Sequence, residues 1–225
     1  MDNPDFSSIS LKICQRQFFD PDHLVSQIKE LNNLNQTDEV GRNLLMMSLV
    51  TQQDLLFEQL LNLNFDFNHL DKDGKNFLFY FAQYLRHSKI NYDRVFQKPV
   101  NIYQQTNKRN DLFVYSLICG NSNLCLYLLK NDFKIDKKNL INKLHSGRLI
   151  DFLFSNFGSP ILEKLVEKKI LLKKDFNSQN FSMEKIKIIN FKLYKNLEYF
   201  FEVISVKDKI NKNIKNNHKI NKGKL

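Results

Sequence analysis

Two short segments of the chain are apolar at almost every position. They are residues 44–50 (LLMMSLV) and 77–82 (FLFYFA), and they begin 33 residues apart. Each follows a polar stretch with a central glycine, DEVGRN at 38–43 and DKDGKN at 71–76. A helix without a polar face has to be covered on most sides, and a fixed repeat of this length is typical of stacked repeat proteins. The pattern predicts short buried helices, each entered through a glycine turn and covered by neighbouring copies of the unit.

A second, amphipathic helix completes the unit. Residues 54–63 (DLLFEQLLNL) place Leu56, Leu60 and Leu63 on one helical stripe, and the aspartate that opens the segment is a suitable N-cap. In the next copy the corresponding segment, near 91–97, is polar and is followed by Pro99. We therefore expect an irregular or shortened second helix there, because proline cannot continue a helix.

Two further copies follow with weaker patterns. In the third copy Asn110 aligns with Asn76 at a spacing of 34 residues, so Asn110 is expected to cap its first helix. A fourth, shorter copy has residues 139–145 as its first helix and 148–158 as its second, without the D-x-x-G turn. The repeats are thus expected to fill residues 38–158.

The N-terminal part, residues 1–37, is expected to be a degenerate repeat that caps the stack. Asp5 lies 33 residues before Asp38, which suggests a leading copy of the turn. Asp20 and Pro21 are a good N-cap and first residue for a helix that we predict over 21–32. Its polar outer face suits a terminal unit.

The C-terminal part is expected to hold a helical cap over 159–206 and a tail over 207–225. Ser159 and Pro160 open a helix that the apolar spacing extends to 174. Ser182 opens another, favoured over a strand because its apolar spacing holds for several turns. The alternative is that 159–206 is a separate effector or enzymatic domain. The tail has seven Lys, five Asn and one acidic residue, so we expect it to be disordered.

The repeat resembles the ankyrin repeat, which reads D-x-x-G-x-T-P-L-H-x-A, then a second helix ending in L-L, then G-A-D-V-N. The matching segments are DEVGRNLLMMS at 38–48, Leu60–Leu61 and NFDFN at 64–68. The T-P-L-H stretch is replaced here by NLLM at 43–46, and Asn64 stands for the usual glycine. The resemblance covers about residues 5–158. It implies an all-α fold, an ankyrin-like helical solenoid of stacked helix-turn-helix repeats.

The same resemblance implies a non-enzymatic protein-interaction module. Members of the family bind partner proteins through hairpin tips and the face of the inner helices. On this chain the expected tip residues are Glu39, Val40, Arg42, Lys72, Asp73, Lys75, Asn107 and Arg109. Similar AT-rich ankyrin proteins act on host proteins, so the resemblance also suggests a host-directed effector. The three cysteines, Cys14, Cys119 and Cys125, are too few and too irregular for a disulfide framework, so we expect a reducing, cytoplasmic compartment. We expect the protein to be a monomer.

The charge distribution adds an alternative. The net charge of +10 combines −2 over residues 1–120 with +12 over residues 121–225. Such asymmetry is compatible with nonspecific, salt-sensitive binding of nucleic acid or an anionic membrane. The lysines expected to lie together on one helix are Lys164, Lys168, Lys169, Lys173 and Lys174.

Sequence motifs for catalysis, cofactors or metals are absent. The chain has no G-x-x-x-x-G-K-[ST], G-x-G-x-x-G or G-x-S-x-G, and its five histidines are scattered. DKDG at 71–74 resembles the start of a calcium loop but lacks its terminal Glu, so the repeat turn explains it better. Cys119 and Cys125 lie in apolar helical segments and are expected to be core residues. No apolar stretch is long enough to span a membrane, and no secretory signal is expected.

Overall fold

The computed structural model describes residues 5–15, 20–85, 90–147 and 149–222, with side chains up to residue 211. Within these residues the protein is all-helical, and its one extended pairing is a single bridge between Asn177 and Ser182. The chain divides into two compact units, unit 1 at Met1–Ile135 and unit 2 at Asp136–Leu225. The division falls between the third and fourth copies of the repeat. The boundaries predicted at 37, 158 and 206 stay predictions.

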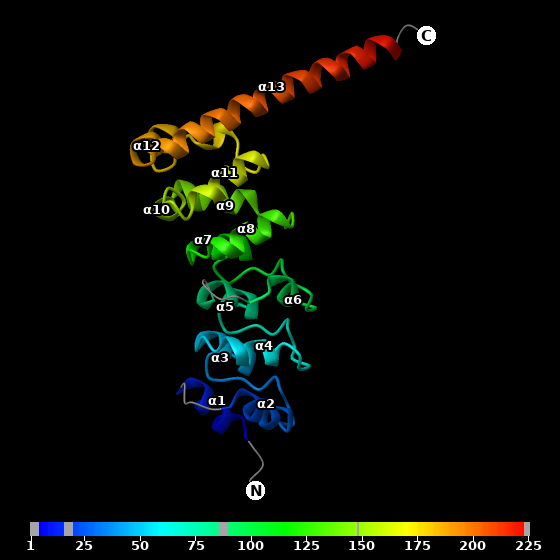
Figure 1. The fold of residues 1–225 in the computed structure, drawn as a ribbon, viewed down its shortest axis with the longest axis vertical. Helices are drawn as coiled ribbons and strands as arrows, with labels where there is room; N and C mark the ends of the chain where they lie inside the picture. Colours follow the sequence, from blue (N-terminus) through cyan, green and yellow to red (C-terminus); the bar gives the residue numbers. More distant parts are fainter. Residues whose placement is uncertain (1–4, 16–19, 86–89, 148, 223–225) are drawn as a thin grey trace. The chain divides into compact units, whose positions relative to one another are not determined.

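Unit 1 consists of four successive helix pairs (Figure 1). The pairs are α1 (Phe6–Cys14) with α2 (Pro21–Lys29), α3 (Leu44–Val50) with α4 (Asp54–Leu60), α5 (Phe77–Tyr84) with α6 (Tyr92–Phe96), and α7 (Leu112–Ile118) with α8 (Ser122–Lys130). The first helices stack on one another in the order α1, α3, α5 and α7, and α2 packs on α4. The bounds of α3 and the shortness of α6 confirm the sequence prediction. The prediction for α4 was wrong at both ends: Asp54 is the first residue of the helix rather than its N-cap, which is Gln53, and the helix ends at Leu60 rather than at Leu63.

Stacking covers the apolar first helices on all sides. The side chains of α5 from Phe77 to Ala82 are buried, and so are those of α3 from Leu44 to Leu49. Phe57 of α4 touches Phe77 and Phe81 of the next layer, with ring centroids 6.3 and 6.0 Å apart. Each layer thus supplies the apolar surface that its neighbour needs.

The two glycine turns have the same hydrogen bonds. In the first, the backbone N–H of Asp38 donates to Arg42 O and that of Gly41 donates to Asp38 O, at 3.0 and 2.9 Å. In the second, Asp71 and Gly74 make the equivalent bonds at 2.9 and 3.0 Å. Both glycines have positive φ, 87° and 74°, which disfavours any residue with a Cβ. The repeat geometry therefore explains the D-x-x-G spacing.

The third turn corrects the alignment of the third copy. Thr106 replaces the aspartate, and Arg109, with φ of 56°, replaces the glycine, so the spacing from Asp71 is 35 residues rather than 34. Consequently Asp111, not Asn110, caps α7 by accepting from Val114 N–H at 2.7 Å. The prediction for Asn110 was wrong by one residue, because one residue is added before the turn.

The N-terminal aspartate also has another role than predicted. Asp5 is the N-cap of α1 and accepts a hydrogen bond from Ser8 N–H at 2.8 Å. Asp38 instead closes a turn. Their separation of 33 residues is therefore not a structural repeat, although α1 and α2 do form a leading helix pair. The helix predicted over 21–32 is shorter, ending at Lys29.

Polar side chains connect successive layers at the start of the second helices. Gln53 Nε2 donates to Ile13 O of the first layer at 2.8 Å. At the equivalent place two layers on, the buried Asn121 donates through Nδ2 to Ala82 O at 3.0 Å and accepts from Leu124 N–H. These bonds satisfy carbonyls at the ends of the preceding first helices, which would otherwise lack partners.

Unit 2 begins with the fourth copy and ends in a long helix. Its elements are α9 (Lys137–His145), α10 (Ile150–Leu153), α11 (Ser159–Glu167), the 3-10 turn η1 (Lys173–Asp175), α12 (Met183–Ile189) and α13 (Phe191–Lys222). The first helix of the fourth copy is confirmed. Its second helix is much shorter than the predicted 148–158, because the Ser155 side chain bonds back to Phe152 O and the chain turns before Gly158.

Three further predictions in unit 2 were wrong. The helix predicted to run from 160 to 174 ends at Glu167, because Lys169 has φ of 58° and Ile170 N–H bonds back to Leu165 O. The helix from Ser182 is interrupted at Asn190, whose side chain caps α13 through Leu193 N–H. Of the tail expected to be disordered, residues up to Lys222 continue α13, and residues 223–225 lie outside the described residues; no Gly or Pro interrupts the helix before 223, and lysine is a good helix former.

A reciprocal substitution tests the repeat geometry at the ends of the first helices. Gln52 and Gly120 follow α3 and α7 at equivalent places, with φ of 58° and 70°. Because glycine adopts this conformation without a Cβ clash, Gln52→Gly should raise the free energy of unfolding by about 1 kcal/mol. Gly120→Gln should lower it by about the same amount. Urea denaturation measures both, and a destabilised Gln52→Gly variant would contradict the assigned backbone.

Candidate partner-binding site

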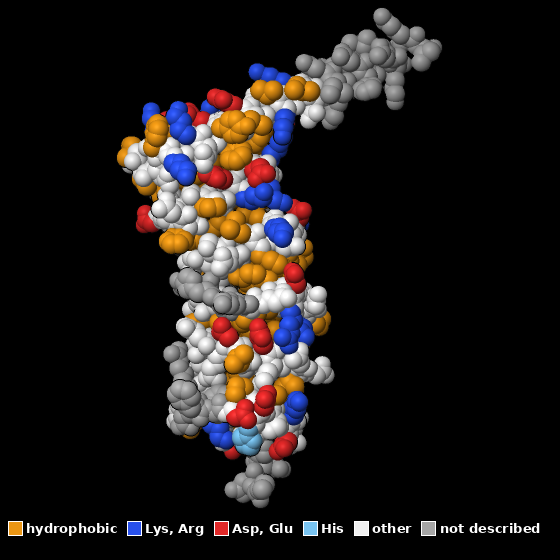
Figure 2. Space-filling view, viewed as in Figure 1, with side chains coloured by type: hydrophobic (Ala, Val, Ile, Leu, Met, Phe, Trp, Pro, Cys, Tyr) orange, Lys and Arg blue, Asp and Glu red, His pale blue; other side chains and the backbone are white. Residues whose placement is uncertain are grey.

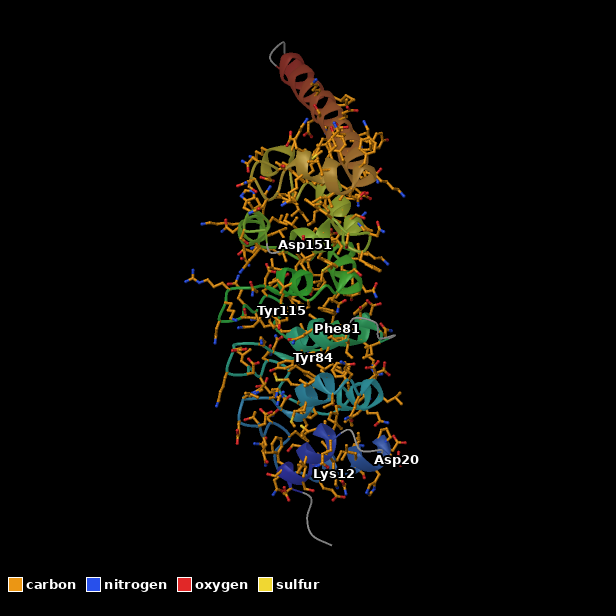
Figure 3. The ribbon with its side chains drawn as sticks, turned by 90° about the vertical axis from the view of Figure 1, so that its left-hand side faces the viewer. Lys12, Asp20, Phe81, Tyr84, Tyr115 and Asp151 are labelled. Atoms are coloured by element: carbon orange, nitrogen blue, oxygen red, sulfur yellow. The ribbon has the colours of Figure 1, made fainter. Side chains whose placement is uncertain are left out.

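A hollow of about 240 Å³ lies on unit 1 between two turns and one helix. The first turn supplies Val40 and Arg42, and the second supplies Asp71, Lys72, Asp73 and Lys75. Helix α5 supplies Tyr80, Gln83 and Tyr84. Figure 3 shows the loops of unit 1 projecting on one side of the stacked helices. The hollow therefore lies where hairpin tips and the inner-helix face meet.

The floor of the hollow is a buried hydrogen-bond network around Asp71. Its Oδ1 accepts from the N–H groups of Asp73 and Lys75, each at 2.8 Å, and its Oδ2 accepts from the Tyr80 hydroxyl at 2.6 Å. Burial, together with the hydrogen bond to Asp71, raises the pKa of Tyr80 well above the ordinary phenol range. Tyr80 therefore stays a neutral donor, and the floor is rigid and fully paired.

Ion pairs within each turn hold the rim. Arg42 binds Asp38, with Nε 2.7 Å from Oδ2, and Lys75 Nζ lies 2.8 Å from Asp73 Oδ2. The hydrogen bond and charge of Lys75 lower the pKa of the Asp73 carboxyl. Lys72 is exposed on the same rim. The hollow consequently presents both charge signs without a strong excess of either.

An aromatic wall extends the hollow toward the next layer. The rings of Tyr80 and Tyr84 stack with centroids 6.3 Å apart. Tyr115 of α7 donates its hydroxyl to Gln83 Oε1 at 2.7 Å, and Lys75 Nζ lies 5.8 Å from the Tyr115 ring centroid. Figure 3 shows Tyr84 and Tyr115 on neighbouring layers of the stack. Large amphipathic rings of this kind are enriched at protein interfaces.

Backbone hydrogen bonds fix the tips relative to one another. Lys72 N–H donates to Val40 O at 3.1 Å, and Asn107 N–H donates to Asp73 O at 2.8 Å. A Cβ on Gly74 would lie 2.6 Å from Asn107 Oδ1, so this approach requires glycine. The tips are thus preorganised, which reduces the entropy that binding would cost.

Five of the eight predicted tip residues come together in the hollow: Val40, Arg42, Lys72, Asp73 and Lys75. Glu39 is an exposed tip residue outside the lining, Asn107 bonds across to the second tip, and Arg109 occupies the glycine position of the third turn. Sequence reasoning missed Tyr80, Gln83 and Tyr84 as lining residues. The available signal was a tyrosine within the run NFLFYFAQY, since a hydroxyl in a buried helix needs a partner.

The structure does not place the five candidate anion-binding lysines on one helix. Lys164 lies in α11 and pairs with Glu167 at 2.8 Å, whereas Lys168 caps the end of that helix. Lys169 pairs with Asp208 at 2.6 Å, and Lys173 and Lys174 belong to η1. The chain turns after Glu167, so the predicted continuous row of lysines was wrong.

Other chemistry was sought in the part of the chain that the structure describes. Cys125 is buried, and burial raises the pKa of its thiol, whereas Cys119 is half-buried and Cys14 exposed. Among the described residues no group of three or more His, Cys, Asp or Glu side chains could hold a metal ion. No described helix combines the length and apolar character needed to cross a membrane.

Comparison with known proteins assigns no family. No protein-family model matches the chain, and no curated protein matches it either. The inference about function therefore depends on the geometry of unit 1.

Removing one hydroxyl tests the network under the hollow. Tyr80→Phe should lower the free energy of unfolding by about 1–2 kcal/mol, because Asp71 loses a buried charge-assisted hydrogen bond. Tyr84→Phe, at the half-buried rim, should change it by less than about 0.5 kcal/mol. Denaturant unfolding of both variants gives the comparison, and equal effects would contradict the described network.

The raised pKa of Tyr80 predicts a specific alkaline effect. A folded-state pKa above the unfolded value means that the neutral phenol contributes stability below about pH 10. Above that pH the unfolded chain ionises first, so this contribution is lost. The urea midpoint of the wild type should therefore fall more steeply above about pH 10 than that of Tyr80→Phe. Parallel pH curves would show that Tyr80 is not coupled to folding.

Proposed function

We propose that unit 1 is a degenerate ankyrin-type repeat module that binds a partner protein. Support comes from the recurring turn, in which Asp38 and Asp71 accept from glycine N–H groups with matching geometry. Stacked first helices and the Gly41 and Gly74 conformations also agree with that repeat type. The role of the tip residues as partner contacts follows from this proposed repeat type.

The single observation that carries the binding proposal is the hollow itself. Tips that are separated by 33 residues in sequence converge with Tyr80 and the half-buried C-terminal end of α5 around one recess. Recesses bordered by aromatic and basic side chains are where interface hot spots concentrate. The described tips are connected by backbone bonds, so they offer a fixed shape to a partner.

The chemistry of the rim indicates the kind of contact. Arg42 and Lys75 are already paired with acidic residues of their own turns. Strong attraction for a highly charged anion is therefore not the basis of the proposal. The complementary group is a partner side chain that packs against Tyr84 inside the recess and places a polar end beside Lys72.

We further propose that the protein works as a binder without catalysis, in the reducing cytoplasm. None of the three cysteines, all described, is in a disulfide, as expected in such a compartment. Cytoplasmic action on a host protein rests on the family resemblance alone.

A comparison of capture by variants tests this function. The tagged full chain is used to capture partners from cell lysate, with the wild type beside a Lys72→Glu/Tyr84→Ala variant. If the hollow is the contact, this variant should reduce capture of the specific partner about tenfold or more. A matched control, Leu55→Ser/Lys130→Glu, changes exposed residues of α4 and α8 instead. Equal losses in both variants, or a loss confined to the control, would contradict the assignment.

A further inference from the structure

Helix α13 of unit 2 has an apolar stripe that its own unit leaves uncovered. Tyr199, Val203, Val206 and Ile210 follow at intervals of four, three and four residues. At 100° per residue they fall within an arc of about 60°. Tyr199, Val206 and Ile210 are 63%, 55% and 52% exposed. Figure 2 shows hydrophobic side chains on the described part of α13 with basic side chains beside them.

The opposite side of α13 is already occupied. Leu193 and Leu197 are buried, and the helix packs on α11 and α12. Asp208 bonds to Lys169 of the segment after α11 at 2.6 Å. On the helical wheel Leu197 and Asp208 lie about half a turn from the centre of the stripe, and Leu193 about a third of a turn. The stripe therefore points away from the packed side of α13, with Tyr199, Val206 and Ile210 exposed and Val203 half-buried.

The form of the stripe indicates a helical occupant. A narrow row with four-three-four spacing is the seam of a coiled coil, whereas a helix that packs on a globular core has a wider apolar face. In heptad terms Tyr199 and Val206 are d positions, and Val203 and Ile210 are a positions. The positions that flank this seam carry Phe200 (e), Glu202 (g), Lys207 (e) and Lys209 (g).

We propose that α13 is a self-association helix, whose seam binds α13 of a second copy of this chain. The argument is charge complementarity in a symmetric pair. In a parallel pair, Glu202 faces Lys207 of the second copy. In an antiparallel pair, Glu202 faces Lys209 of the second copy. Either arrangement makes two equivalent attractive pairs beside the seam.

The excess positive charge of the helix does not oppose this pairing. In the sequence register the next lysines, at 212 and 215, fall at c and f positions of the heptad, which are not seam or flanking positions. An anionic membrane would attract the same lysines, but it gives no reason for an acidic Glu202 at the edge of a narrow seam. This inference replaces the monomer expected at the outset, and it is independent of the function proposed for unit 1.

Charge reversal with rescue tests the proposal. Sedimentation equilibrium of the full chain over a concentration series should show a monomer–dimer equilibrium. Glu202→Lys should weaken it about tenfold, since two attractive pairs become repulsive. Adding Lys207→Glu should restore the affinity if the helices are parallel, and adding Lys209→Glu should restore it if they are antiparallel.

The apolar seam is tested with a matched pair of variants. Ile210→Glu should abolish dimers, whereas Ile188→Glu should not, although Ile188 of α12 is 84% exposed. A wild type that stays monomeric at every concentration would overturn the proposal, as would a dimer indifferent to both Glu202→Lys and Ile210→Glu. Monomers that instead cosediment with vesicles of anionic phospholipid, and lose this with Ile210→Glu, would assign the stripe to a membrane and equally overturn it.

Discussion

Unit 1 depends on the burial of helices that have no polar face. Helix α5 alone buries three phenylalanines and a tyrosine in its first five residues, and α3 buries six consecutive side chains. Neither helix could be exposed to water on one side, as the helices of a simple bundle are. Stacking solves this problem, because α3 lies between α1 and α5, and α5 lies between α3 and α7. The same requirement makes isolated copies of the repeat unstable, so the stack folds as a cooperative array.

Burial of apolar side chains does not by itself fix how successive layers align. The turns determine this register, and they carry the residues proposed to bind a partner. Asp71 bonds to its own turn and to Tyr80, which connects the tip to the helix beneath it. The backbone bonds from Lys72 to Val40 and from Asn107 to Asp73 then connect one tip to the next. The recess between tips and helix is a consequence of this register.

Local structure was predictable from the sequence where one residue type determines the backbone conformation. Gly41 and Gly74 predicted the turns, and the apolar run at 44–50 predicted α3 to the residue.

Predictions failed where a single residue changed the register or the direction of the chain. The third turn uses Thr106 and Arg109, and nothing in their identity indicates that Arg109 takes the left-handed conformation. Lys169 likewise ends α11 in a conformation that lysine rarely adopts, and Asn190 divides a helix whose apolar spacing is continuous. The recess was missed because Tyr80, Gln83 and Tyr84 meet the tips only after the chain has folded.

The most direct test of the central claim is a hydrogen-exchange footprint of the full chain with a partner obtained by capture. On binding, exchange should slow at the tips around Val40 and Lys72–Lys75 and at the C-terminal end of α5. Exchange in α4 and α8, on the second-helix side of unit 1, should be unchanged. Protection confined to those second helices, with the tips unaffected, would contradict the claim that the recess is the binding site.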